Sequence, residues 1–224
     1  MLMQSPKTPY YLQTALDRAI ELFAERDSQK SHEKLSQQRF CHQELGHIKV
    51  LAQIEAGLAR YREEAKAVDI CSQGQASFKA TSKDLREEQH CSEMLGKHLR
   101  AVGKPKPDDR VDAHAMVAGK HVEAAEIRAV MARLRIRVDD PDNGMWMPRR
   151  SKDTPHWAFP ACPPHSRIHR YNYYFWVRSH LLHLADEMLF RKTLQLMAKQ
   201  LHEGHYPDYV MMRKGQGLPF EDDL

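Results

Sequence analysis

The sequence predicts a mainly α-helical protein with a small β-hairpin. Apolar residues recur at helical spacing through the first hundred residues and again after residue 166. Between these parts, a turn-forming run at residues 139–144 is flanked by two short apolar stretches. The 224 residues are 42% hydrophobic and 29% charged, which is typical of one medium folded domain or two small ones.

The first part of the chain is predicted to be helical throughout. Helices are expected over about residues 11–23, from a cap at Ser31 to a break at residues 72–77, and over about residues 82–102. The last helix ends at Gly103, and residues 103–109 have the composition of a linker. We therefore predict a helical N-terminal domain over residues 1–106 and a second domain over residues 107–224.

The second part is predicted to mix short strands with helices. Strands are expected over residues 111–117, 136–138 and 145–147, and helices from Gly119, over residues 166–184 and over residues 186–202. Residues 151–164 have loop composition, and the proline-rich stretch around them carries prolines at 148, 155, 160 and 163.

Basic residues concentrate in the second part. The whole chain has a net charge of +4 and a pI of about 8.8, which is only mildly basic. Residues 143–180, however, contain six basic residues and a single acidic one, Asp153. The basic residues are Arg149, Arg150, Lys152, Arg167, Arg170 and Arg178. Such a stretch is typical of phosphate-backbone binding, with a solvated basic face as the alternative.

Several function classes are disfavoured by what the sequence lacks. The four cysteines form no CxxC pair, which argues against a cysteine zinc site. No apolar run is long enough to span a bilayer. The first ten residues show no Sec-type signal features, so we expect synthesis in the cytoplasm.

A histidine pattern points to a metal site. His165 and His169 are four residues apart at the start of a predicted helix, where both imidazoles would lie on one face. His114 lies about fifty residues upstream on a predicted strand, and Asn143 lies between them at the predicted hairpin. A strand histidine, a hairpin asparagine and an HxxxH helix, in that order, are typical of a ββα-metal finger.

Residues 112 to about 182 resemble the AHH family of HNH-type nucleases, which occur as modules of bacterial polymorphic toxins. The resemblance rests on Ala113-His114-Ala115, on Asn143-Gly144 with Pro148 after it, and on His165 and His169 followed by tyrosines. It covers about a third of the chain. It implies a ββα-metal nuclease finger with added helices. In that finger, His114, His165 and His169 would hold one divalent ion (Zn, Mg, Mn or Ni).

One position departs from the family motif. The second histidine of the motif is Ala115 here, and the resemblance implies that this histidine activates water as the general base. This chain is therefore expected to be catalytically dead, through either an engineered substitution or natural decay. The resemblance also implies that Asn143 orients the base across the hairpin.

Further site residues are expected around this core. Arg149, Arg150, Arg167 and Arg170 are candidates for phosphate binding. His121 and His156 are possible members of the site, or else a helix-start histidine and a loop histidine.

The resemblance implies a DNA-cutting toxin of interbacterial competition, secreted as a type VI or similar effector into a target cell. Its partners would be nucleic acid, a cognate immunity protein and a secretion adaptor or chaperone, with residues 1–106 serving delivery, trafficking or partner binding. The rival interpretation is a non-catalytic module that binds metal and nucleic acid. A structural zinc finger is disfavoured, because three histidines leave a fourth position open.

Overall fold

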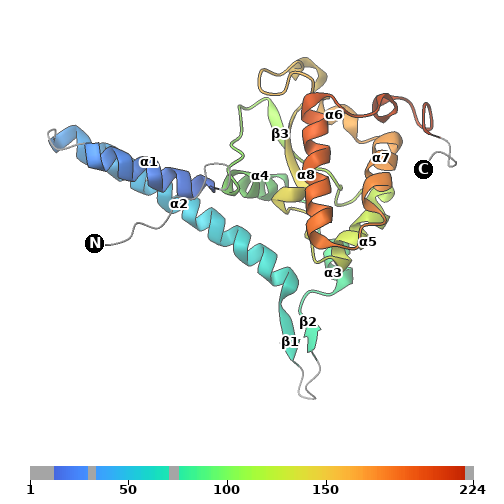
Figure 1. Ribbon diagram of the computed structural model, residues 1–224, viewed down its shortest axis with the longest axis horizontal. Helices are drawn as coiled ribbons and strands as arrows, with labels where there is room; N and C mark the ends of the chain where they lie inside the picture. Colours follow the sequence, from blue (N-terminus) through green and yellow to red (C-terminus); the bar gives the residue numbers. More distant parts are fainter. Residues whose placement is uncertain (1–12, 30–33, 71–75, 220–224) are drawn as a thin grey trace.

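The computed structural model describes residues 13–29, 34–70 and 76–219, and it confirms a mainly helical chain with a small hairpin (Figure 1). Two antiparallel two-stranded sheets are present in these ranges, β1–β2 and β3–β4. No helix of the described residues is long and apolar enough to cross a membrane.

The predicted N-terminal helices form a helical hairpin. Helix α1 (Ala15–Gln29) packs along α2 (Lys34–Lys66), and Figure 1 shows the pair projecting from the rest of the molecule. The expected cap at Ser31 and the start near residue 11 lie outside the described residues. After α2, strands β1 (Val68–Ile70) and β2 (Ala76–Phe78) pair in a region where the sequence predicted only a break.

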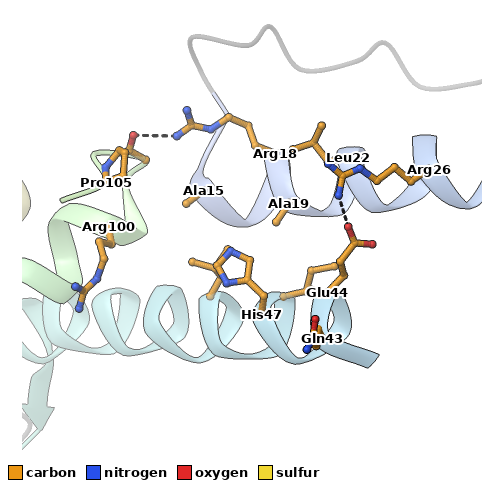
Figure 2. A pocket seen from close by; sticks show the side chains of 13 residues that line it. Ala15, Arg18, Ala19, Leu22, Arg26, Gln43, Glu44, His47, Arg100 and Pro105 are labelled. Atoms are coloured by element: carbon orange, nitrogen blue, oxygen red, sulfur yellow. Dashed lines mark hydrogen bonds and ion pairs between the residues drawn. The ribbon is translucent and has the colours of Figure 1, made fainter. Parts of the chain in front are cut away.

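A groove of about 570 Å³ lies where this helical hairpin meets the residues after α4 (Ser92–Ala101). Figure 2 shows Arg26 of α1 paired with Glu44 of α2 across it. At its other end, the guanidinium of Arg18 donates to the carbonyl of Gly103 at 3.0 Å. The Arg26–Glu44 pair joins the two helices of the hairpin, and the Arg18–Gly103 bond attaches the hairpin to the remainder of the fold.

The second sheet separates two apolar layers. Strand β3 (Val111–Ala115) pairs with β4 (Gly144–Pro148), and His114 stands opposite Met145 in the register. Because side chains alternate along a strand, Val111, Ala113 and Ala115 share one face with Trp146 and pack on Leu95 and Leu99 of α4. The opposite face carries His114, Met145 and Met147 and meets the C-terminal helices.

The main core lies on that opposite face. It is built from α5 (Ala125–Arg133), α7 (Tyr171–Leu181) and α8 (Glu187–Glu203), together with residues of β4. The expected helix over residues 186–202 is confirmed as α8, with Asp186 capping its first turn. The helix expected from Gly119 begins later, with a 3₁₀ turn η2 (Val122–Ala124) before α5.

The helix predicted over residues 82–102 is two helices, α3 (Ser82–Glu87) and α4. The residues between them bond to a distant loop instead of continuing the helix. The Glu88 carboxylate accepts from Arg137 at 2.9 Å, and the backbone N–H of Cys91 donates to Asp139 at 2.8 Å. Tertiary contacts therefore interrupt a stretch whose local sequence favours a helix.

The strand predicted over residues 136–138 is also absent: these residues form a loop. Arg135 adopts a left-handed conformation with φ 59°, which turns the chain sharply after α5. The turn predicted at residues 139–144 is present, as η3 (Pro141–Asn143) leading into β4. The loop after α5 thus runs back along α2, where Arg137 bonds to the Tyr61 carbonyl at 3.0 Å.

The division into residues 1–106 and 107–224 stays a prediction. Across it, α4 packs against β3, and the indole N–H of Trp146 donates to the Lys104 carbonyl at 3.0 Å. The second domain therefore shares its hairpin face with α4.

Candidate metal centre

Three histidines from separate elements meet beside the β3–β4 sheet. His114 lies in β3, His165 begins the short helix α6 (His165–Ile168), and His169 is the C-cap residue that follows it. One ring nitrogen from each lies within 4.8 Å of the others. The three residues expected as metal ligands are thus brought together.

Hydrogen bonding determines which nitrogen of His114 is free. Its Nε2 lies 3.1 Å from the Tyr173 hydroxyl, and that hydroxyl donates its only hydrogen to the Met116 carbonyl at 2.8 Å. The hydroxyl must then accept from His114, so Nε2 carries the proton. Nδ1 is left as a lone pair, and it is buried with no hydrogen-bond partner. A buried acceptor without a partner is costly unless a ligand such as a metal ion satisfies it.

His165 and His169 face each other through Nε2, with 3.1 Å between the two nitrogens. The sequence predicted one continuous helix here, and this was wrong: α6 ends at Ile168, its C-cap His169 has a ψ of 73°, and α7 starts at Tyr171. The Nδ1 of His169 lies 2.7 Å from the Tyr174 hydroxyl. This bond on the far nitrogen orients the ring, as is usual for metal-binding histidines.

The surroundings of all three imidazoles favour the neutral form that metal binding requires. Burial and the neighbouring His165 and His169 lower the pKa of His114 well below its usual value. Burial also lowers the pKa of His165. Burial and the charge on His165 lower the pKa of His169 to about 4. Three neutral nitrogens converging on one point fit a divalent ion with an open coordination position.

An acidic side chain, that of Asp112, lies next to the three histidines. Asp112 shares the sheet face of His114, two residues before it, and its Oδ2 lies 4.0 Å from Nδ1 of His165. Arg149 holds this carboxylate through Nε, at 3.0 and 3.1 Å from its two oxygens. The guanidinium of Arg149, expected to bind phosphate, is thus engaged with Asp112 at the edge of the site.

Asn143 is completely buried and ties the hairpin together. Its Oδ1 accepts from the Val117 N–H at 2.9 Å, and its Nδ2 donates to the carbonyls of Val117 at 3.2 Å and Val138 at 2.8 Å. These bonds fix the chain just after His114. That Asn143 orients a base at residue 115 stays a prediction.

Ala115 lies on the other face of the sheet from His114. It is 4% exposed and packs in the apolar cluster with Leu95 and Trp146. Its strand partner is Gly144, where an added Cβ would come within 2.5 Å of Leu95. A larger side chain at residue 115 would therefore have to enter a filled space beside α4.

The other expected site residues are distributed unevenly. His121 stacks on Tyr174 with ring centroids 4.2 Å apart, which places it beside His169. His156 is buried in another cluster, where its Nε2 lies 3.2 Å from the Asp108 carboxylate. Arg150 and Arg167 are exposed, whereas Arg170 donates to the Met211 carbonyl at 2.9 Å.

Several residues at the centre were not predicted from the sequence. Strand alternation would have placed Asp112 beside His114. Tyr173 and Tyr174 follow the HxxxH pair in the sequence, and both rings are buried while their hydroxyls reach the imidazoles. His90, which bonds to Asp139 49 residues away, carried no sequence signal.

Residues 95–201 match a family model, AHH, described as a nuclease family of the HNH/ENDO VII superfamily with conserved AHH. The matched residues include all three histidines and read Ala113-His114-Ala115 at the motif. Neither the curated proteins nor the solved structures gave a match. Over residues 95–201, just under half of its length, the chain is thus similar to the AHH nucleases of the HNH/ENDO VII superfamily.

Proposed function

We propose that this protein is a metal-dependent endonuclease that hydrolyses phosphodiester bonds, with DNA as the favoured target. The observation that carries the proposal is the convergence of His114, His165 and His169, whose ligand nitrogens lie within 4.8 Å of one another in the family segment. The ion would be Zn, Mg, Mn or Ni, since imidazoles suit several first-row metals.

The surrounding residues have distinct tasks in this reaction. A bound divalent ion would polarise the scissile phosphate and stabilise the leaving oxygen. The hydroxyl of Tyr173 orients the imidazole of His114, and the hydroxyl of Tyr174 orients that of His169. The exposed guanidiniums of Arg150 and Arg167 are available to the phosphate backbone on the α6 side.

Residue 115 is the position at which the family motif has its general base, so the residue there affects the expected rate of cleavage. With alanine there, no side chain at that position accepts the proton of the attacking water, and losing a general base costs about 10²–10⁴-fold in rate. The proposal of an inactive form, whether engineered or natural, therefore depends on whether another group accepts that proton.

The biological setting is proposed from the family resemblance. The nuclease would act as a toxin between bacteria, made in the cytoplasm and delivered into a target cell by a secretion system such as type VI. A cognate immunity protein would protect the producer. The projecting α1–α2 hairpin offers a separate surface for a secretion adaptor or chaperone.

A non-catalytic module that binds metal and nucleic acid is the second candidate, and Ala115 is the observation in its favour. Incubation of supercoiled plasmid with the protein and each of the four metals separates the two. Metal-dependent nicking that disappears in a His165→Ala, His169→Ala variant supports the nuclease. Retained metal and DNA binding with no cleavage, in this chain and in Ala115→His alike, supports the binding module.

A further inference from the structure

We propose that His90, held by Asp139, accepts the proton of the attacking water in this nuclease. The inference rests on the proposed function and adds a catalytic residue to it. His90 precedes the family segment of residues 95–201, so the family motif does not assign it. Its imidazole would accept the proton that the methyl side chain of Ala115 cannot accept.

Asp139 is built to hold the imidazole of His90. The carboxylate is buried; one oxygen bonds to Nδ1 of His90, and the other accepts from the Cys91 N–H at 2.8 Å. The backbone of Asp139 is held as well, since its N–H donates to the Tyr61 hydroxyl at 2.9 Å and its carbonyl lies 2.7 Å from Nδ1 of His98. Together these bonds fix the orientation of the Asp139 carboxylate.

The Asp139 contact determines the tautomer of His90. An ionised carboxylate only accepts hydrogen bonds, so Nδ1 of His90 carries a proton. In the neutral ring, Nε2 then holds the lone pair, which is the form that a general base needs. The side chain is 26% exposed, so water reaches the ring.

His90 lies at the same end of the sheet as the metal centre. The neighbouring Ser92 hydroxyl donates to the carbonyl of Ala113, the residue before His114, at 2.9 Å. Gly119 packs so closely on His90 that an added Cβ there would lie 2.9 Å from the His90 Cβ.

His121, the other histidine beside the centre, has the opposite tautomer. Its Nδ1 accepts from the Glu123 N–H at 3.3 Å, so its neutral ring carries the proton on Nε2. That ring donates a hydrogen bond and has no free lone pair. His121 is thus suited to contact a phosphate oxygen, and His90 to remove a proton.

In the proposed step, one proton passes from the attacking water to His90. The water oxygen forms a bond to phosphorus as one of its protons moves to Nε2 of His90. The bond from phosphorus to the leaving sugar oxygen breaks, and that oxygen takes a proton from solvent. His90 then returns its proton to solvent, which regenerates the neutral ring.

The test compares the unmodified chain with His90→Gly, His90→Gln and Asp139→Asn in metal-dependent plasmid cleavage. His183→Ala is the control, because His183 is exposed and outside the site. We expect cleavage by the unmodified chain and the control, a loss of about 10²–10⁴-fold in both His90 variants, and unchanged metal content. Added imidazole should restore His90→Gly at least about tenfold but not His90→Gln, whose side chain fills the space.

A second readout does not depend on activity. A nitrogen–proton NMR correlation spectrum of the unmodified chain should show His90 protonated on Nδ1 and bare on Nε2, and Asp139→Asn should alter that tautomer balance. Cleavage unaffected in His90→Gln would overturn the inference and leave the nuclease proposal intact. A chain that binds metal without cutting would also overturn it, and Ala115→His would then decide the nuclease proposal.

Discussion

The Tyr173 hydroxyl lies 3.1 Å from Nε2 of His114 and donates its own hydrogen to the Met116 carbonyl. This relationship leaves Nδ1 of His114, which is buried and unpartnered, as the nitrogen available to a ligand in the cluster with His165 and His169. A tyrosine of the core thus selects the ligand atom of the strand histidine.

Replacing Tyr173 with phenylalanine should weaken metal binding. Without the acceptor, His114 loses the bond that fixes its tautomer, and losses of this kind typically cost about 10–100-fold in metal affinity. Titration against a chromophoric zinc chelator measures the change. Tyr209→Phe is the matched control, because the Tyr209 ring packs on Phe175 and not on one of the three histidines. Equal affinity in the two variants would show that Tyr173 does not position the ligand.

Replacing Asn143 should destabilise the hairpin. Asn143→Ala removes three buried hydrogen bonds and leaves their backbone partners unsatisfied, so we expect a loss of about 2–4 kcal/mol in the free energy of unfolding. Urea unfolding of the metal-free protein measures it. Asn143→Asp should also destabilise, because a carboxylate would face the carbonyls of Val117 and Val138. A loss below about 1 kcal/mol in both variants would contradict this role.

The metal-free protein should lose stability as the solution is acidified. The folded-state pKa values of His114, His165 and His169 are all lowered, that of His169 to about 4, whereas an unfolded chain titrates near 6.5. Between those values the unfolded state binds more protons, so stability is full above about pH 6.5 and falls toward pH 4.

Unfolding midpoints of the metal-free protein across this pH range provide the test. The His165→Ala, His169→Ala variant should show a shallower decline, because two of the three histidines are gone. A decline of equal steepness in both proteins would assign the pH dependence to other groups.

Ala115→His distinguishes two accounts of catalysis. With His90 as the proton acceptor, the new imidazole should change cleavage by less than about tenfold. It should also lower stability by about 1–3 kcal/mol, because it must enter the packed cluster beside Leu95. The matched control is Ala113→Ser, a small change on the same face. A gain of about 10²-fold or more would instead show that residue 115 is the missing base.

Much of the fold could be predicted because it depends on local patterns. The helical periodicity of α1, α2 and α8 and the turn before β4 are visible in short windows of sequence. The break between α3 and α4 is not, because it arises where Cys91 bonds to Asp139, 48 residues away. The local sequence favours one continuous helix, and tertiary hydrogen bonds divide it into α3 and α4.

The site shows the same division. His114, His165 and His169 have a recognisable order and spacing, so their convergence could be predicted from the family resemblance. The tautomer of His114 depends on Tyr173, and the contact of His90 with Asp139 depends on the loop after α5. Neither relationship has a sequence spacing that distinguishes it from chance.

The central claim is that His114, His165 and His169 hold one divalent ion. Elemental analysis of the purified chain, after loading with zinc and removal of the excess, tests it most directly. We expect about one ion per chain in the unmodified protein and in His183→Ala, and almost none in His165→Ala, His169→Ala. Unchanged metal content in the folded double variant would contradict the ligand assignment and the function built on it.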